Sequence, residues 1–187
     1  MSSDLVELTE DSHDIFIDMP YADERNFTGK PVYNQAKVLL HKDAEVKLQK
    51  AIEQARNIGL KFIIYDAYRP PKAQFIFWDH SPNPDFLANP HKRGSPHSRG
   101  VAVDVGLADI VTGEPLEMGT PFDSFLPESW HANYNVSIEA QRNRLILAGI
   151  MLNAGFDNYS HEWWHYQFFN SYEYPLLEDE RLGVIEP

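Results

Sequence analysis

Two short segments of the chain concentrate residues that can bind a metal or move a proton. They are residues 95–104 and residues 162–165. A hydrolytic zinc site needs three nitrogen or oxygen ligands, a fourth position open to water, and a carboxylate that accepts the proton of that water. The two segments supply three candidate ligands and one candidate base, namely His97, Asp104, His165 and Glu162.

The cysteine count limits the chemistry that these residues can do. The chain has no cysteine and eight histidines among its 187 residues. Disulfides, thiolate metal sites and cysteine nucleophiles are therefore excluded, and any metal must be held by His, Asp or Glu.

The spacing within each segment requires a break in regular structure. His97 and Asp104 are seven residues apart, so one continuous strand would place their side chains on opposite faces. A turn at Gly100 can shift the phase and let both side chains converge. Glu162 and His165 would also oppose each other on a strand, so we expect Glu162 to lie in the turn before it.

Each motif alone has a less specific interpretation. An isolated Glu-x-x-His or a single aspartate in a strand is more often a hydrogen-bonded structural group. Glu128 and His131 form a second Glu-x-x-His, and paired motifs of this kind are typical of di-iron four-helix bundles. Such a bundle needs four long amphipathic helices, whereas the sequence predicts only two that are convincing. Four other histidines lie among polar residues in the sequence, so we expect them to be solvated. They are His13, His41, His80 and His91.

The motifs in combination resemble the VanX-type D-alanyl-D-alanine dipeptidases. These zinc enzymes belong to a wider group with D-Ala-D-Ala carboxypeptidases, lysostaphin-like endopeptidases and the hedgehog signalling domain. The group shows Ser-x-His, Gly-x-Ala-x-Asp and Glu-x-x-His, which stand here at Ser95/His97, Gly100/Ala102/Asp104 and Glu162/His165. Other matching segments are residues 20–22, 26–29, 66–70 and 119–123, so the resemblance spans roughly Tyr21 to Tyr166.

The resemblance implies a role for each matching residue. His97, Asp104 and His165 would be the zinc ligands, and Glu162 would be the general base that later protonates the leaving amine. Arg69 would stabilise the oxyanion, although a surface ion pair with Asp66 is the alternative. Asp123 would receive the substrate ammonium, and a helix cap or a turn acid is its alternative. The residues that would assist Asp123 are Tyr21 and Ser95.

The function implied by the resemblance is hydrolysis of D-alanyl-D-alanine to two D-alanines, with one Zn²⁺ per chain. One alternative is a D,D- or L,D-carboxypeptidase acting on peptidoglycan stem peptides. Another is a catalytically silent zinc-binding interaction domain, as in hedgehog-like members. The presence of Glu162 argues against silence, because a structural zinc site has no use for a base beside an open position.

The first half of the chain shows helix and strand patterns that precede these motifs. Apolar residues recur at helical spacing over residues 44–55, and Gly59 stands where a helix commonly ends. Residues 60–65 then form a short β-branched and aromatic run typical of a buried strand. Pro70 and Pro71 can begin another helix that ends before Pro82.

The second half predicts further strands and one long helix. Residues 100–107 alternate as a strand, and residues 109–112 and 163–169 are also strand-like. Ile138, Leu145, Ala148 and Leu152 mark a helix between Ser137 as its cap and Gly155 at its end. We therefore predict one compact α+β domain over residues 1–187, with helices packed on a small, mainly antiparallel sheet that carries the zinc site.

The net charge and the hydropathy of the chain limit the classes of partner that it is expected to bind. The formal net charge of −12 disfavours nucleic acid and anionic membranes as partners. The partner that the resemblance implies is a small dipeptide substrate. No secretory signal is visible and no run approaches the about 18 apolar residues of a membrane helix. A cytoplasmic location is expected, or a periplasmic one if the sequence is a trimmed mature form. The sequence predicts no oligomeric state and no role for His131 or for the segment after Phe169.

Overall fold

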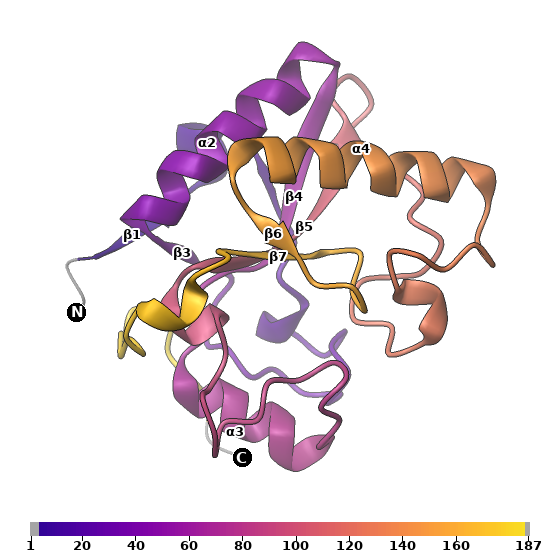
Figure 1. Ribbon diagram of the computed structural model, residues 1–187. Coiled ribbons are helices and arrows are strands. Elements are labelled where there is room, and N and C mark those ends of the chain that lie inside the picture. The colour runs from indigo at the N-terminus through magenta and orange to yellow at the C-terminus, as the bar shows by residue number, and fades with distance from the viewer. Residues whose placement is uncertain (1–3, 186–187) are drawn as a thin grey trace.

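A five-stranded sheet forms the centre of the computed structural model, which describes residues 4–185 (Figure 1). In spatial order its strands are β2 (Phe16–Ile17), β4 (Leu60–Asp66), β5 (Ala102–Asp109), β7 (His165–Gln167) and β6 (Asp157–Asn158). Only the β2–β4 pair is parallel within this sheet. The prediction of an α+β fold with a mainly antiparallel sheet is confirmed. Residues 1–3 and 186–187, the ends of the predicted domain, lie outside the described residues.

Four α-helices accompany this sheet within residues 4–185. They are α1 (Glu10–His13), α2 (Lys42–Asn57), α3 (Pro71–His80) and α4 (Ile138–Ala154). Figure 1 shows α2 and α4 crossing on one side of the strands, while α3 lies at the opposite end. The predicted helices over residues 44–55, after Pro70 and from Ser137 are all present. None of the helices within residues 4–185 has the length and hydrophobicity that a bilayer crossing requires.

Helix α2 follows its sequence pattern closely. Its buried residues are Ala44, Leu48, Ala51, Ile52 and Ala55. Gly59 follows the helix with φ +80°, as a terminating glycine should. His41 caps the start, because its Nδ1 accepts a hydrogen bond from the Asp43 amide at 3.2 Å. The expectation that His41 is solvated is therefore wrong, since only 7% of this residue is exposed.

Helix α4 has the predicted ends but a different buried face. The Ser137 hydroxyl accepts from the Ala140 amide at 3.0 Å, and Gly155 ends the helix in a left-handed conformation. Ile138 and Leu145, which mark the helix in the sequence, are 69% and 73% exposed. The buried residues are instead Ala140, Arg144, Leu147, Ile150, Met151 and Ala154. Apolar residues occur all round this helix, so the periodicity alone did not select the buried face.

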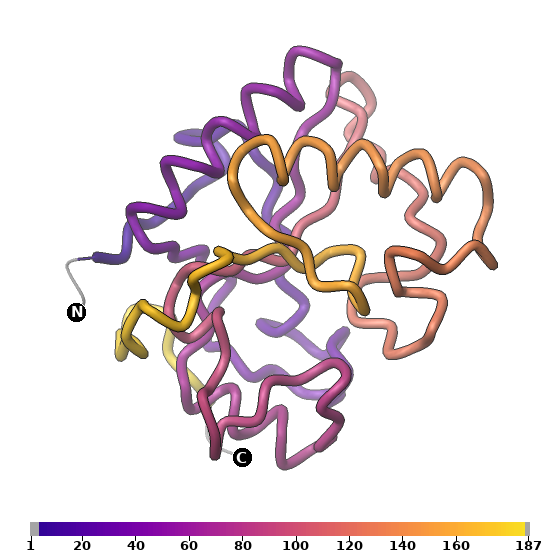
Figure 2. The backbone as a smooth tube through the Cα atoms, viewed as in Figure 1, coloured from indigo at the N-terminus to yellow at the C-terminus, as the bar shows by residue number. Residues whose placement is uncertain are grey.

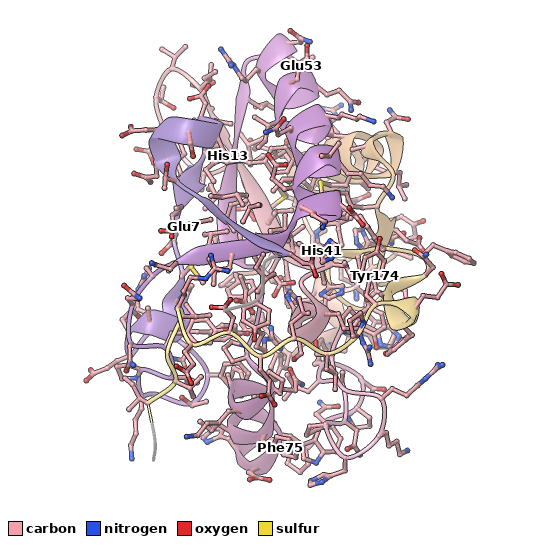
Figure 3. The ribbon with its side chains drawn as sticks, turned by 90° about the vertical axis from the view of Figure 1, so that its left-hand side faces the viewer. Glu7, His13, His41, Glu53, Phe75 and Tyr174 are labelled. Carbon is pink, nitrogen blue, oxygen red and sulfur yellow. The ribbon has the colours of Figure 1, made fainter. Side chains whose placement is uncertain are left out.

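A second, two-stranded sheet was not predicted. It pairs β1 (Leu5–Leu8) with β3 (Val38–His41), and every residue of β3 is buried. The C-terminal segment runs along this side of the molecule, where the rings of Tyr174 and His41 are nearly perpendicular with centroids 5.0 Å apart (Figure 3). Farther along, the Leu177 amide donates to the Ser98 carbonyl at 2.9 Å. The segment after Phe169 is therefore part of the packed structure.

Two predicted strands differ from the structure. Residues 110–112 form a turn rather than a strand, because the Asp109 carboxylate accepts hydrogen bonds from the Val111 and Thr112 amides. The strand predicted over residues 163–169 is confined to β7, and Glu162 precedes it as expected.

The turn before β5 brings the first ligand segment to the sheet. Figure 2 traces the long path from the end of α3 back to β5. On this path His97 lies in a 3₁₀ turn (His97–Arg99), and Gly100 follows with φ +69°. The left-handed glycine separates His97 from the strand phase of Asp104, which is the break that the spacing required.

We predict that Gly100→Ala lowers the free energy of unfolding more than Gly59→Ala does. Both glycines have positive φ, which costs an alanine about 1–2 kcal/mol. A Cβ at Gly59 would meet no atom within 4 Å, but one at Gly100 would lie 2.7 Å from Leu5 Cδ2 and 3.1 Å from the His41 amide nitrogen. Urea denaturation measures both losses, and equal losses would contradict the close approach at Gly100.

Candidate metal centre

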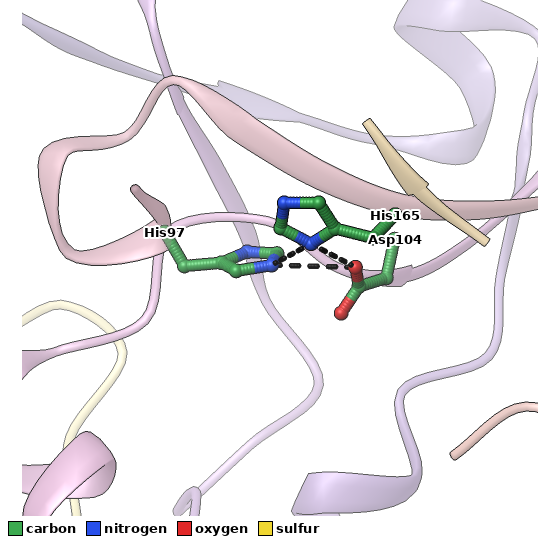
Figure 4. Close-up of side chains that lie close together, drawn as sticks. All are labelled: His97, Asp104 and His165. Atoms are coloured by element: carbon green, nitrogen blue, oxygen red, sulfur yellow. Dashed lines mark hydrogen bonds and ion pairs between the residues drawn. The ribbon is translucent and has the colours of Figure 1, made fainter. Parts of the chain in front are cut away.

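Three side chains from separate elements meet at the centre of the sheet (Figure 4). Asp104 on β5 and His165 on β7 are direct partners in the antiparallel register, which places both side chains on one face. His97 reaches the same point from its 3₁₀ turn. Asp104 Oδ1 lies 3.3 Å from His97 Nε2 and 3.1 Å from His165 Nδ1, and the two nitrogens are 3.1 Å apart.

This donor set fits a divalent cation such as zinc. Two imidazole nitrogens and one carboxylate oxygen face a common point, and all three residues are buried. Nitrogen and oxygen ligands of this kind suit a four-coordinate zinc site that keeps one position open. Within residues 4–185, these three residues make the one cluster with spacing suited to a metal.

The site holds opposing electrostatic effects. Burial by itself raises the pKa of Asp104, but the adjacent imidazoles of His97 and His165 lower it well below its usual range. Glu162 Oε2 lies 3.8 Å from His165 Nδ1. Burial, together with the carboxylates of Asp104 and Asp123, raises the pKa of Glu162 well above its ordinary value. A carboxyl group whose neutral form is favoured thus lies beside the ligand cluster.

Arg69 forms an ion pair with Asp66, but in the interior rather than at the surface. Its Nε donates to Asp66 Oδ2 at 2.9 Å, and its Nη1 donates to Gln74 Oε1 at 2.9 Å. Tyr33 donates its hydroxyl to the other oxygen of Asp66 at 3.0 Å. Although burial opposes it, the Asp66 carboxylate holds the pKa of Arg69 well above its ordinary value. The guanidinium is therefore charged and fixed, with Nη2 3.5 Å from Asp104 Oδ2.

Asp123 lies in a turn, so the helix-cap alternative is wrong and the turn position is the one that the structure shows. It has φ +64°, a left-handed conformation that aspartate tolerates better than most residues. The residue is partly exposed, yet its Oδ2 is buried and has no hydrogen-bond partner among residues 4–185. Burial raises the pKa of Asp123 to about 7, against the opposing effect of the Tyr21 hydroxyl. An unpartnered carboxylate oxygen of this kind suits a cationic group.

One cavity of about 240 Å³ joins all the candidate site residues. Its lining includes the eight that the sequence analysis singled out, namely Tyr21, Arg69, Ser95, His97, Asp104, Asp123, Glu162 and His165. Ser95 is buried, and its hydroxyl accepts from the His97 amide at 3.1 Å. The sequence analysis named Asp66 only as the partner of a surface ion pair, and it missed Gln74 and Gln167. Asp66 stands in a matched segment of the sequence, whereas nothing in the sequence distinguishes the two glutamines.

The second Glu-x-x-His belongs to no metal cluster among residues 4–185. The ring of His131 packs edge-on against Tyr166 with centroids 5.9 Å apart. Burial and the nearby Arg144 lower the pKa of His131 to about 4. Arg144 itself donates to the carbonyls of Met118, Glu128 and Trp130. This corner of the structure packs the loop that carries Asp123, and the di-iron alternative has no site here.

We predict that acid destabilises the metal-free protein partly through His131. The unfolded chain protonates this residue near pH 6.5, whereas the folded protein resists protonation until about pH 4. The unfolded state therefore binds more protons in that window, and the free energy of unfolding falls as the pH decreases. His131→Gln should reduce this slope, measured by urea denaturation at several pH values without metal. If the free energy of unfolding falls equally with decreasing pH in wild type and in His131→Gln, this role of His131 is contradicted.

Comparison with known proteins identifies relatives along the chain. A family model described as D-Ala-D-Ala dipeptidase matches residues 1–180. A D-alanyl-D-alanine dipeptidase of Escherichia coli K12 is 42% identical over 186 residues, covering 100% of this chain and 95% of the relative. A D-alanyl-D-alanine dipeptidase of Enterococcus faecium is 35% identical over 178 residues, covering 85% of this chain and 88% of the relative.

A more distant likeness is to a solved structure, that of a VanY D,D-pentapeptidase in complex with Zn(II). It is 17% identical with a TM-score of 0.48, covering 72% of this chain and 75% of the other.

Proposed function

Because the chain belongs to the D-Ala-D-Ala dipeptidase family, we propose that it hydrolyses D-alanyl-D-alanine to two D-alanines at a zinc centre. The observation that carries the proposal is the position of Glu162 beside three converging metal-ligand atoms. A structural metal site has no need of such a base. We further propose that each chain binds one zinc ion and that residues 1–187 form one domain. The cytoplasmic location stays a prediction.

The proposed ligands are His97 Nε2, Asp104 Oδ1 and His165 Nδ1. When bound there, Zn²⁺ supplies a Lewis acid that lowers the pKa of water and favours ionised carboxylates nearby. Glu162 accepts the proton of the attacking water and later donates it to the leaving amine.

Arg69 is placed to stabilise the oxyanion. Its guanidinium is held by Asp66 and Gln74, so it does not need to reorganise when negative charge develops on the substrate. The planar group can direct two N–H bonds at one centre, which a lysine ammonium on a flexible stem cannot reproduce.

The amine end of the substrate is assigned to Asp123, with Tyr21 and Ser95 beside it in the cavity. The buried Oδ2 of Asp123 is free to pair with an ammonium. That pair favours a free dipeptide over a longer peptide, and it is the feature that separates a dipeptidase from the carboxypeptidase alternative.

The direct test is to incubate the zinc-loaded protein with D-Ala-D-Ala, L-Ala-L-Ala and N-acetyl-D-Ala-D-Ala and to measure released alanine. We expect rapid release only from the first compound. Equal hydrolysis of the acetylated compound would favour the carboxypeptidase alternative. No hydrolysis of any compound by a zinc-loaded protein would favour the silent binding domain.

We predict that Glu162→Gln retains zinc and loses activity. The amide keeps the shape of the side chain but cannot accept a proton, so kcat should fall by about 10²–10⁴-fold. Elemental analysis of zinc and steady-state kinetics check the two parts separately. Undiminished turnover in this variant would show that another group is the base.

We also predict that Asp123→Asn narrows the gap between free and acetylated substrates. Acetylation removes the ammonium and leaves a buried carboxylate unpaired, a cost of about 1–3 kcal/mol. The variant should slow hydrolysis of the free dipeptide much more than that of the acetylated one, measured as kcat/KM for each. An equal decrease for both compounds would remove Asp123 from amine recognition.

A further inference from the structure

The two histidines of the proposed zinc centre face Asp104 with different ring nitrogens. His97 uses Nε2 and His165 uses Nδ1, as the dashed contacts in Figure 4 show. A neutral imidazole offers a lone pair on one nitrogen only, and the other nitrogen carries the hydrogen. The partner of the outward nitrogen therefore decides whether the inward nitrogen can bind a metal.

The outward nitrogen of His97 has a partner that can only accept. Its Nδ1 lies 2.7 Å from the carbonyl oxygen of Ala67. A backbone carbonyl has no hydrogen to donate, so it stabilises the Nδ1–H form and leaves Nε2 free. This control comes from the backbone, and the nearest carboxylate oxygen, Asp66 Oδ2, lies farther from the same nitrogen at 3.9 Å.

The outward nitrogen of His165 depends on a side chain instead. Its Nε2 lies 2.9 Å from Gln167 Oε1. A carboxamide can accept through its oxygen or donate through its nitrogen, and only the first of these stabilises the Nε2–H form. In the structure the oxygen faces the ring, which leaves Nδ1 free to bind a metal.

The sheet places Gln167 where this contact is possible. His165 and Gln167 are two residues apart on β7, so their side chains share a face of the strand. The register pairs Asp104 with His165 and Ala102 with Gln167. Gln167 also lines the cavity and is partly buried, so water competes less for its amide than it would at the surface.

We propose that Gln167 is a positioning residue that fixes the tautomer and orientation of His165 for zinc binding. This inference rests on the proposed function, because it takes the three-residue cluster to be a zinc site. Gln167 does not touch the metal position or the substrate in this role. A neutral amide oxygen orients the ring, and a carboxylate in its place would do the same and make Nδ1 a stronger donor.

The test compares zinc affinities of wild-type protein, Gln167→Leu and Gln167→Glu by titration of the metal-free proteins against a competing chelator. Gln167→Leu should raise the Kd for zinc by about 10–100-fold. Gln167→Glu should bind zinc at least as tightly as wild type. Gln141→Leu is the matched control, because Gln141 is also partly buried but donates to backbone carbonyls on α4's N-terminal side.

Two further readouts separate positioning from a general structural effect. Thermal unfolding of the metal-free variants shows whether the fold is retained, and the visible absorption of the cobalt-substituted proteins reports the ligand geometry. We expect the cobalt spectrum to change in Gln167→Leu and to be preserved in Gln167→Glu and in Gln141→Leu.

The outcomes distinguish this inference from the function on which it rests. A wild-type protein that fails to bind zinc overturns both proposals. If wild type binds zinc and hydrolyses D-Ala-D-Ala while Gln167→Leu keeps the same Kd, only the role of Gln167 is wrong. Weakened binding in Gln167→Glu equal to that in Gln167→Leu also overturns it, because the acceptor would then not be the cause.

Discussion

The register between β5 and β7 is the constraint on which the site depends. It sets Asp104 directly opposite His165, and a slip of one residue would turn one of them to the other face of the sheet. His97 joins them only because a left-handed glycine stands between its 3₁₀ turn and β5. Strand pairing and one backbone conformation thus bring together ligands that are 68 residues apart in the chain.

Around this register the protein buries several ionisable side chains. Asp66, Arg69, Asp104 and Glu162 are all nearly inaccessible to solvent. Among residues 4–185, Arg69 is the one buried arginine or lysine that contacts both Asp66 and Asp104, so the remaining negative charge favours a metal ion at the cluster. Burial, together with this excess of negative charge, raises the pKa of Glu162 and of Asp123. The affinity of the site for a cation is therefore related to the properties of the proposed base and of the amine site.

The sequence predicted the parts of the fold whose signals are local. Helix α2 has one apolar face and clear ends. The eight candidate site residues came from motifs and from a family resemblance, and all of them line one cavity. Strands of two to four residues such as β1, β2 and β3 were missed, because pairing with distant partners stabilises them rather than their own pattern. Gln74 and Gln167 were missed for a related reason, since only the folded chain shows which groups their amides contact.

The most direct test of this account is a crystal structure of the zinc-loaded protein with anomalous data collected at the zinc edge. The account predicts one strong peak per chain, about 2.0–2.2 Å from His97 Nε2, Asp104 Oδ1 and His165 Nδ1. A peak elsewhere in a protein that hydrolyses D-Ala-D-Ala, or an empty cluster in such a protein, would contradict it.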